Sequence, residues 1–265
     1  GQKCVDVMTT DIVKDCTEIS ALASKAALGF FRKQIGVEFK SDDSPVTHAD
    51  KSVEALVRAE IARRHPDHGI LGEEHGQERT DHPDLWVVDP IDGTRSFISG
   101  HPLFGFLLAY LHEGAPQVGV IAMPALDETY VGASGQGATL NGAPIRVSSQ
   151  AMLDHAIIYI NEGDKIFADH PDLFAVLMRT GKTRRLSYDC YPHALLASGH
   201  VDVVVDYDLK PYDFLALRPV IEAAGGCLSD WQGNIPRADY EGAIVASATP
   251  ELHDQMLTLL RGARP

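Results

Sequence analysis

The chain has 265 residues, of which 45% are hydrophobic and 23% charged, as is typical of a soluble globular protein large enough to bury a core. The formal net charge of −14 argues against a nucleic-acid or anionic-membrane partner. The longest apolar run, residues 104–111, contains a glycine and is far too short to span a bilayer. An anionic small substrate is not excluded, because a bound metal ion inverts the potential of an acidic pocket.

The four cysteines, Cys4, Cys16, Cys190 and Cys227, show neither CxxC spacing nor companion histidines at zinc spacing. Reduced, structural thiols in a cytoplasmic protein are therefore expected. The N-terminal residues lack the basic, apolar and small-residue succession of a signal peptide, which favours the same location.

The first elements predicted in chain order are two helices separated by a short strand and a polar turn. Apolar residues at helical spacing predict a helix over 8–35, and residues 37–40 form a strand candidate. A second helix begins after Thr47, its expected N-cap, which places Asp50 in the first turn. The helix dipole alone would explain an aspartate there. His48 is interpreted as a surface residue.

Carboxylates end the next two predicted strands. Residues 68–72 lead into Glu73, and the apolar run 85–88 leads into the sequence DPIDGT at 89–94. Two aspartates supply the oxygen ligands that Mg²⁺ prefers, and the amides of Gly93, Thr94 and Arg95, at a helix start, would face an anion. Asp-Pro and Asp-Gly also form ordinary turns, so these residues alone favour a turn and a site equally.

The middle of the chain is predicted to be β-structure. Strands are expected over 104–111, 117–122 and 128–133, and Asn141-Gly142 predicts a type I′ hairpin. Gly132, Gly135 and Gly137 have the wrong order for a dinucleotide-binding motif and are assigned to a bend or bulge. The polar stretch around 148–154 separates an N-terminal α+β half, 1–150, from a C-terminal α/β half, 151–265, within one compact unit.

The C-terminal half alternates strands and helices. Strands are predicted over 156–160, 184–186, 201–205 and 243–246, and helices over 166–179, 191–199, 211–224 and 250–260. Asp213 would lie in the first turn of its helix, where the dipole and a metal ion explain an aspartate equally well. His193 is interpreted as structural or exposed rather than catalytic.

Three ordered motifs together resemble the inositol monophosphatase superfamily: Gly72-Glu73-Glu74, DPIDGT at 89–94, and Asp213 ahead of EAAGG at 222–226. These are Mg²⁺-dependent, typically lithium-sensitive phosphomonoesterases that act on small-molecule phosphate monoesters. The resemblance covers nearly the whole chain. It implies an α+β fold, a layered αβαβα sandwich, and usually a homodimer.

The resemblance also implies the roles of individual residues. Two or three Mg²⁺ ions would be held by Glu73, Asp89, the backbone carbonyl of Ile91, Asp92 and Asp213. Asp50 and Thr94 would orient and deprotonate the attacking water, which a metal near Glu73 acidifies. Gly93 and Thr94 would hold the phosphate. Residues 40–47 match the mobile loop over the site in relatives.

The segment 93–105 departs from the Gly-Thr-x-Asn-Phe run of the inositol enzymes and resembles the histidinol-phosphatase branch, as do residues 189–199 and 209–217. Histidinol phosphate carries an amine and an imidazole, so its pocket needs acidic groups such as Asp92, Asp189 and Asp206. Asp206 stands where relatives place a substrate-binding glutamate, and a solvated strand end is its alternative reading.

The sequence therefore predicts hydrolysis of L-histidinol phosphate in histidine biosynthesis. An inositol-1-monophosphatase or a broad-specificity sugar phosphatase is the alternative within the fold. A metal- or phosphate-binding regulator is the non-enzyme alternative.

Overall fold

A computed structural model describes residues 2–42 and 44–262, with side chains from residue 9 onward, so Cys4 lies outside the described side chains. The cysteines that it does describe, Cys16, Cys190 and Cys227, are free thiols. Among the described residues, no helix combines the length and the apolar character that crossing a membrane requires.

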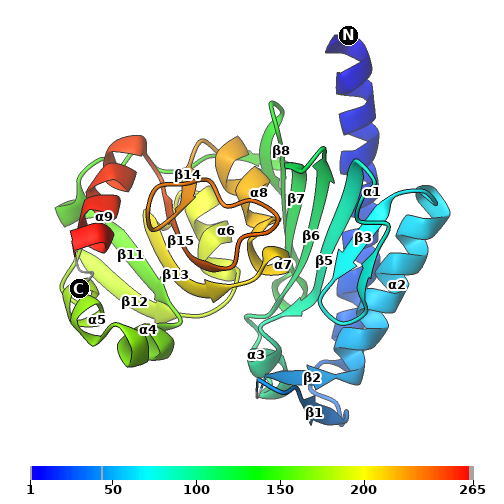
Figure 1. Cartoon of the computed structure of the whole chain (residues 1–265), viewed down its shortest axis with the longest axis horizontal. Coiled ribbons are helices and arrows are strands. Elements are labelled where there is room, and N and C mark those ends of the chain that lie inside the picture. The colour runs from blue at the N-terminus through cyan, green and yellow to red at the C-terminus, as the bar shows by residue number, and fades with distance from the viewer. Residues whose placement is uncertain (1, 43, 263–265) are drawn as a thin grey trace.

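Two large sheets and a small hairpin organise the described part of the chain (Figure 1). The hairpin pairs β1 (Val37–Phe39) with β2 (Pro45–Thr47). The eight-stranded sheet has the order β10-β9-β8-β7-β6-β5-β3-β4 and the five-stranded sheet the order β12-β11-β13-β15-β14. The strands of the first are β3 (Gly69–Gly72), β4 (Gly76–Glu78), β5 (Asp84–Asp92), β6 (Gly105–His112), β7 (Ala115–Met123), β8 (Glu128–Ala133), β9 (Gly137–Leu140) and β10 (Ala143–Ile145). The strands of the second are β11 (Ile157–Asn161), β12 (Thr183–Ser187), β13 (Val203–Leu209), β14 (Cys227–Asp230) and β15 (Gly242–Ser247).

Helices form three layers around these sheets, so the molecule is an αβαβα sandwich (Figure 1). The outer layer on the large sheet holds α1 (Gln2–Phe30) and α2 (His48–Arg64). The central layer holds α6 (Tyr191–Ala197), α7 (Pro211–Phe214) and α8 (Leu217–Ala223). The outer layer on the small sheet holds α4 (Gly163–Asp169), α5 (Pro171–Leu177) and α9 (Pro250–Gly262), and the short α3 (Thr94–Ile98) follows β5. The predicted α+β layered fold is confirmed.

The long apolar runs become strands that are covered on both faces. Phe106, Leu108 and Tyr110 of β6 pack toward α1 and α2, whereas Leu107 and Ala109 pack toward the central helices. A strand buried on both faces reads as a continuous apolar run rather than as an alternating one. At the Asn141-Gly142 hairpin both residues have positive φ, 49° and 82°, as a type I′ turn requires.

Several predicted elements need correction. The helix over 166–179 is two helices, α4 and α5, because Pro171 has no N–H and its ring disfavours helical backbone at the preceding residue. The helix over 211–224 is also divided, by a turn at residues 215–216 between α7 and α8. The first helix ends at Phe30 rather than at residue 35.

Strand β13 starts two residues later than predicted, and it pairs parallel with β11 but antiparallel with β15. The short strands β2, β4 and β14 were not predicted. Gly132 lies within β8, and a Cβ there would come within 2.4 Å of the Pro219 carbonyl oxygen of α8. Close helix packing, rather than a bend, therefore explains this glycine.

Candidate active site

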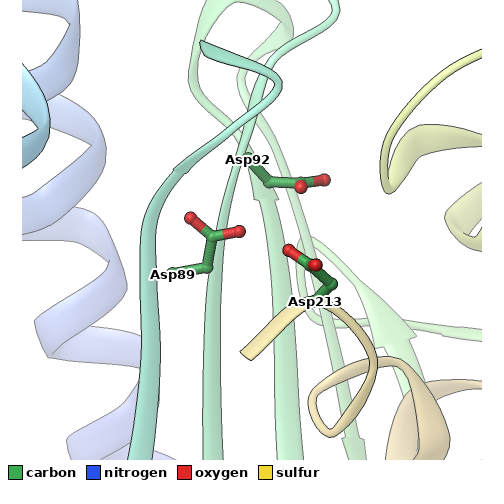
Figure 2. A group of neighbouring side chains, drawn as sticks. All are labelled: Asp89, Asp92 and Asp213. Carbon is green, nitrogen blue, oxygen red and sulfur yellow. The ribbon is translucent and has the colours of Figure 1, made fainter. Parts of the chain in front are cut away.

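Three aspartates converge where β5 ends beside α7. Asp89 and Asp92 extend from β5 and Asp213 from α7, and their carboxylates point toward one another (Figure 2). One oxygen from each lies within 4.8 Å of the others. The pairing of β5 with β6 shifts register between Asp89 and Asp92, at Pro90 and Ile91. This bulge re-aims the side chains, so that residues three apart in one strand face one cavity.

Glu73 joins this cluster because β3 runs parallel to β5. Gly72 pairs with Val88, and the Glu73 N–H donates to the Val88 carbonyl oxygen at 3.2 Å. Glu73, Asp89 and Asp213 line the same cavity. The structure thus brings together four carboxylates that the sequence placed on three separate elements.

Burial and mutual repulsion dominate the electrostatics of the cluster. The pKa values of Asp89 and Asp92 are raised well above that of an ordinary aspartate. Burial is the largest cause, and the charges of neighbouring carboxylates come next. Burial also raises the pKa of Glu73 and of Asp213 to about 6. A cation among these groups would reverse the repulsion.

The donor set fits a hard divalent ion. In the described part of the chain, the buried Oδ1 of Asp89 has no hydrogen-bond partner, although such atoms are almost always paired. The neighbouring ligand atoms are carboxylate oxygens, and Ile91 lines the same cavity. Oxygen donors of this kind are those that Mg²⁺ takes in proteins.

Asp50 and Thr94 meet at the start of α3. The Thr94 hydroxyl donates to Asp50 Oδ1 at 2.8 Å and lies 3.2 Å from the Ile91 carbonyl oxygen. Asp50 Oδ2 accepts from the N–H of Thr47 at 2.9 Å and from its hydroxyl at 2.5 Å. The Asp50 N–H in turn donates to Thr47 Oγ1 at 3.3 Å, which confirms Thr47 as the N-cap of α2. Asp50 is fully buried, and burial raises its pKa. Thr94 lines the cavity, so Asp50 reaches it through Thr94.

Gly93 is required by its own backbone and by its neighbour. Its φ of 87° is left-handed, and a Cβ would lie 2.6 Å from Asp189 Oδ2. The Asp189 carboxylate therefore rests directly against the DPIDGT turn.

The cavity beside these residues has a volume of about 820 Å³, and a second acidic group, contributed by the small sheet and the residues that follow its strands, also lines it. Asp189 and Asp206, both predicted from sequence, lie there with Glu162. Asp206 is held on all sides, because it accepts from Asn161 Nδ2 at 3.0 Å, from the Tyr207 N–H at 2.8 Å and bonds His193 Nε2 at 2.8 Å. The solvated-strand-end reading of Asp206 is wrong, since the residue is only 4% exposed.

The sequence interpretation missed Glu162. Burial raises its pKa to about 7, and burial followed by the charges of Glu162 and Asp206 raises that of Asp189 to about 8. Glu162 directly follows β11, just as Glu73 follows β3, and this shared position was a signal that could have revealed it. The fully buried His193 is structural in its contacts, and His48 is exposed.

Of the predicted loop over 40–47, Pro45–Thr47 form strand β2 of the hairpin beside the cavity. Ser44 and Pro45 line the cavity, and Lys40 Nζ lies 3.0 Å from Glu74 Oε2 and 3.6 Å from Glu73 Oε1. Lys40 thus supplies positive charge at the edge of the acidic cluster.

Comparison with known proteins agrees with this geometry. Residues 8–264 match the model of the inositol monophosphatase family. A histidinol-phosphatase of Chlorobaculum parvum is 39% identical over 244 residues, which cover 91% of this chain and 93% of the relative. A fructose-1,6-bisphosphatase/inositol-1-monophosphatase of Thermotoga maritima is 32% identical, over 81% of this chain and 82% of the relative.

Among solved structures, an inositol monophosphatase from Zymomonas mobilis superposes with a TM-score of 0.86 at 34% identity. The superposition covers 95% of this chain and 98% of that one. Sequence and fold therefore agree along nearly the whole length, and the chain belongs to the inositol monophosphatase family of phosphoric monoester hydrolases, with relatives in its histidinol-phosphatase branch.

Proposed function

We propose that this enzyme is a Mg²⁺-dependent phosphatase of L-histidinol phosphate. The observation that carries the proposal is the second acidic group in the cavity, Glu162 and Asp189, which follow strands of the small sheet and add negative charge beside the metal-type cluster. Lys165 is 3.5 Å from Glu162 but 2.9 Å from Asp208, so two carboxylates share one ammonium. Excess negative charge suits a substrate with a cationic end, and histidinol phosphate has an amine and an imidazole. Apart from its phosphate, inositol phosphate offers these carboxylates only hydroxyl groups and no cation.

The residues divide the chemistry between them. Glu73, Asp89, Ile91, Asp92 and Asp213 would hold two or three Mg²⁺ ions. When bound, these ions lower the pKa of water and neutralise charge on the phosphoryl oxygens and the leaving oxygen. Because the Thr94 hydroxyl donates to Asp50, its lone pairs are free to accept from the attacking water and to orient it. The proton then passes through Thr94 to Asp50, while Gly93 and Thr94 hold the phosphate.

The substrate's amine and imidazole would lie against the carboxylates contributed by the small sheet, and Asp92 would also contact the substrate. In this proposal Asp189 contacts the cationic end directly, and Asp206 contributes its charge from behind. A homodimer, lithium inhibition, a cytoplasmic location, a role in histidine biosynthesis and the division at residue 150 stay predictions from the sequence.

A phosphate-release assay with Mg²⁺ tests the proposal on L-histidinol phosphate, inositol-1-phosphate and fructose-1,6-bisphosphate. We expect the highest kcat/KM for histidinol phosphate. A higher value for inositol-1-phosphate would assign the enzyme to the inositol or sugar phosphatases. If phosphate were released from none of the three substrates, the alternative of a metal- or phosphate-binding regulator would be favoured instead.

A matched pair of variants ties the result to the acidic wall. Asp189→Asn should lower kcat/KM for histidinol phosphate roughly tenfold to a hundredfold, because a hydrogen bond between charged groups is lost. Its activity on inositol-1-phosphate should change far less. Asp164→Asn, which alters an exposed carboxylate that lines the same cavity, is the control.

A further inference from the structure

Glu54 is a buried carboxylate that neither the sequence motifs nor the proposed mechanism uses. It lies on α2, one helical turn after Asp50, and has no exposed surface. A buried charge is costly unless it is paired and hydrogen-bonded, and an apolar residue would fill the space at less cost. Its contacts therefore indicate what the charge is for.

Both oxygens of Glu54 hold the turn between β3 and β4. Oε1 accepts from the Glu74 N–H at 2.8 Å, and Oε2 accepts from the His75 N–H at 2.7 Å. Arg58, one turn further along α2, donates to Oε2 from Nε at 3.1 Å. The Arg58 guanidinium also donates to Glu78 Oε1 at 3.2 Å and to the carbonyl oxygen of Gly76. Glu54 and Arg58 together therefore contact the β3–β4 turn along its whole length.

Gly72 shows how closely the carboxylate approaches the strand. A Cβ at Gly72 would lie 2.5–2.7 Å from the three carboxyl atoms of Glu54, closer than real contacts allow. Gly72 does not have a positive φ, so close approach is the reason for the glycine. The Glu54 carboxylate thus rests on the residue immediately before Glu73.

Each of the three amides in this turn has a defined partner. The Glu73 N–H bonds Val88 of β5, and the next two amides bond Glu54 of α2. The backbone that carries the Glu73 side chain is therefore fixed from both sides. On the same helix, Asp50 is spaced one turn from Glu54 and bonds Thr94. Helix α2 thereby sets the position of the Glu73 turn relative to Thr94.

We infer that Glu54 is the positioning residue for Glu73: by binding two successive amides of the β3–β4 turn, it holds the Glu73 carboxylate in the geometry that ligates the metal. This inference rests on the proposed function only where it takes Glu73 as a metal ligand. Groups that orient metal ligands in this way are typically worth tenfold to a hundredfold in metal affinity.

The test is Glu54→Gln. A glutamine oxygen can accept from one amide, but its NH₂ group then faces the other N–H, donor against donor. We expect hydrogen exchange at the Glu74 and His75 amides to accelerate at least tenfold, with protection elsewhere in α2 and β5 unchanged. Mg²⁺ binding to the metal-depleted protein, measured by calorimetry, should weaken about tenfold. Half-maximal phosphate release should need correspondingly more Mg²⁺, with kcat recovered at high Mg²⁺.

Glu60→Gln is the matched control. It makes the same substitution on the same helix, where Glu60 pairs only with Arg63 and Arg64 among the ion pairs of the described residues. Its exchange rates and Mg²⁺ affinity should equal those of the wild type. Equal behaviour of the two variants in both measurements would overturn the inference.

Gly72→Ala disturbs the same contact, between residue 72 and the Glu54 carboxylate, without changing Glu54. This variant tests the inference if Glu54→Gln does not fold. The new methyl group should displace the Glu54 carboxylate and produce the same local exchange and weaker Mg²⁺ binding. Failure of both variants to fold would show a general structural role and contradict the inference. Exchange and Mg²⁺ binding need no substrate, so they remain valid if histidinol phosphate is not hydrolysed.

Discussion

Aspartates of identical chemistry differ in this cavity because different partners hold them. Both oxygens of Asp50 accept from threonine groups, and Asp206 is held by three protein contacts. Asp89 instead keeps a buried oxygen that lacks a partner among the described residues. Carboxylates satisfied by the protein position other groups, whereas an unsatisfied one suits a cation.

At this scale the sharpest test is Asp213→Asn. The Lys210 N–H donates to Asp213 Oδ2 at 2.9 Å, and an asparagine oxygen can keep that bond while the charge is lost. We expect kcat to fall roughly a hundredfold or more, because a metal ligand loses its charge, while circular dichroism and Tm stay near those of the wild type. Near-native turnover at saturating Mg²⁺ would count against Asp213 as an important ligand.

At the scale of elements, the site depends on how closely α8 packs on the large sheet. A Cβ at Gly119 of β7 would lie 2.1 Å from the Ala216 carbonyl oxygen, and one at Gly132 of β8 would meet Pro219. Strand glycines at these positions let the helix approach the backbone. Because Asp213 lies on α7, immediately before α8, this packing also sets the position of a proposed metal ligand.

Gly119→Ala should therefore destabilise the fold and weaken catalysis together. Overpacking against rigid backbone typically costs about 1–3 kcal/mol, and the displaced α7–α8 segment should reduce kcat. Urea unfolding and phosphate release measure the two effects. Gly29→Ala is the control, because beyond its chain neighbours and the adjacent backbone of its own helix, no described atom lies within 4 Å of the added methyl group. A Gly119→Ala protein as stable and active as the wild type would refute the packing account.

At the scale of the whole molecule, the cavity draws its acidic walls from both sheets. Glu73, Asp89 and Asp92 come from the large sheet, and Glu162, Asp189 and Asp206 follow or belong to strands of the small one. Folding thus gathers negative charges that repel one another, so the metal-free protein should gain stability from added Mg²⁺ and lose it as carboxyl groups ionise.

Glu162 provides a pH test of this balance. Its pKa is raised from 4.5 to about 7 by burial first and by neighbouring carboxylates, so the folded protein favours the protonated form. The resulting stabilisation is complete below about pH 4.5 and is lost as the pH rises through 7. In EDTA, the free energy of unfolding should fall between pH 5 and pH 8 in both proteins, by on the order of 1–3 kcal/mol more in the wild type than in Glu162→Gln. Parallel urea-unfolding profiles of the two proteins would contradict this.

Much of the architecture was predictable because local pattern governs local conformation. Most strands, the Thr47 cap and the Asn141-Gly142 turn follow from periodicity, capping and turn chemistry. The two helix breaks were harder to predict, since the apolar pattern continues across Pro171 and across residues 215–216. The short strands β2, β4 and β14 have too few residues to show a period, and they exist because a partner strand pairs with them.

The sequence by itself determined the chemistry of the site: the DPIDGT turn, the carboxylate after each strand, and the family to which they point. Only the tertiary structure decided which carboxylates meet. Asp213 reaches Asp89 through the packing of α7 on the sheet, Glu162 joins Asp189 in lining the cavity, and Glu54 holds the Glu73 turn. Residues far apart in the chain become neighbours through strand register and helix packing, and local conformational preferences contain neither.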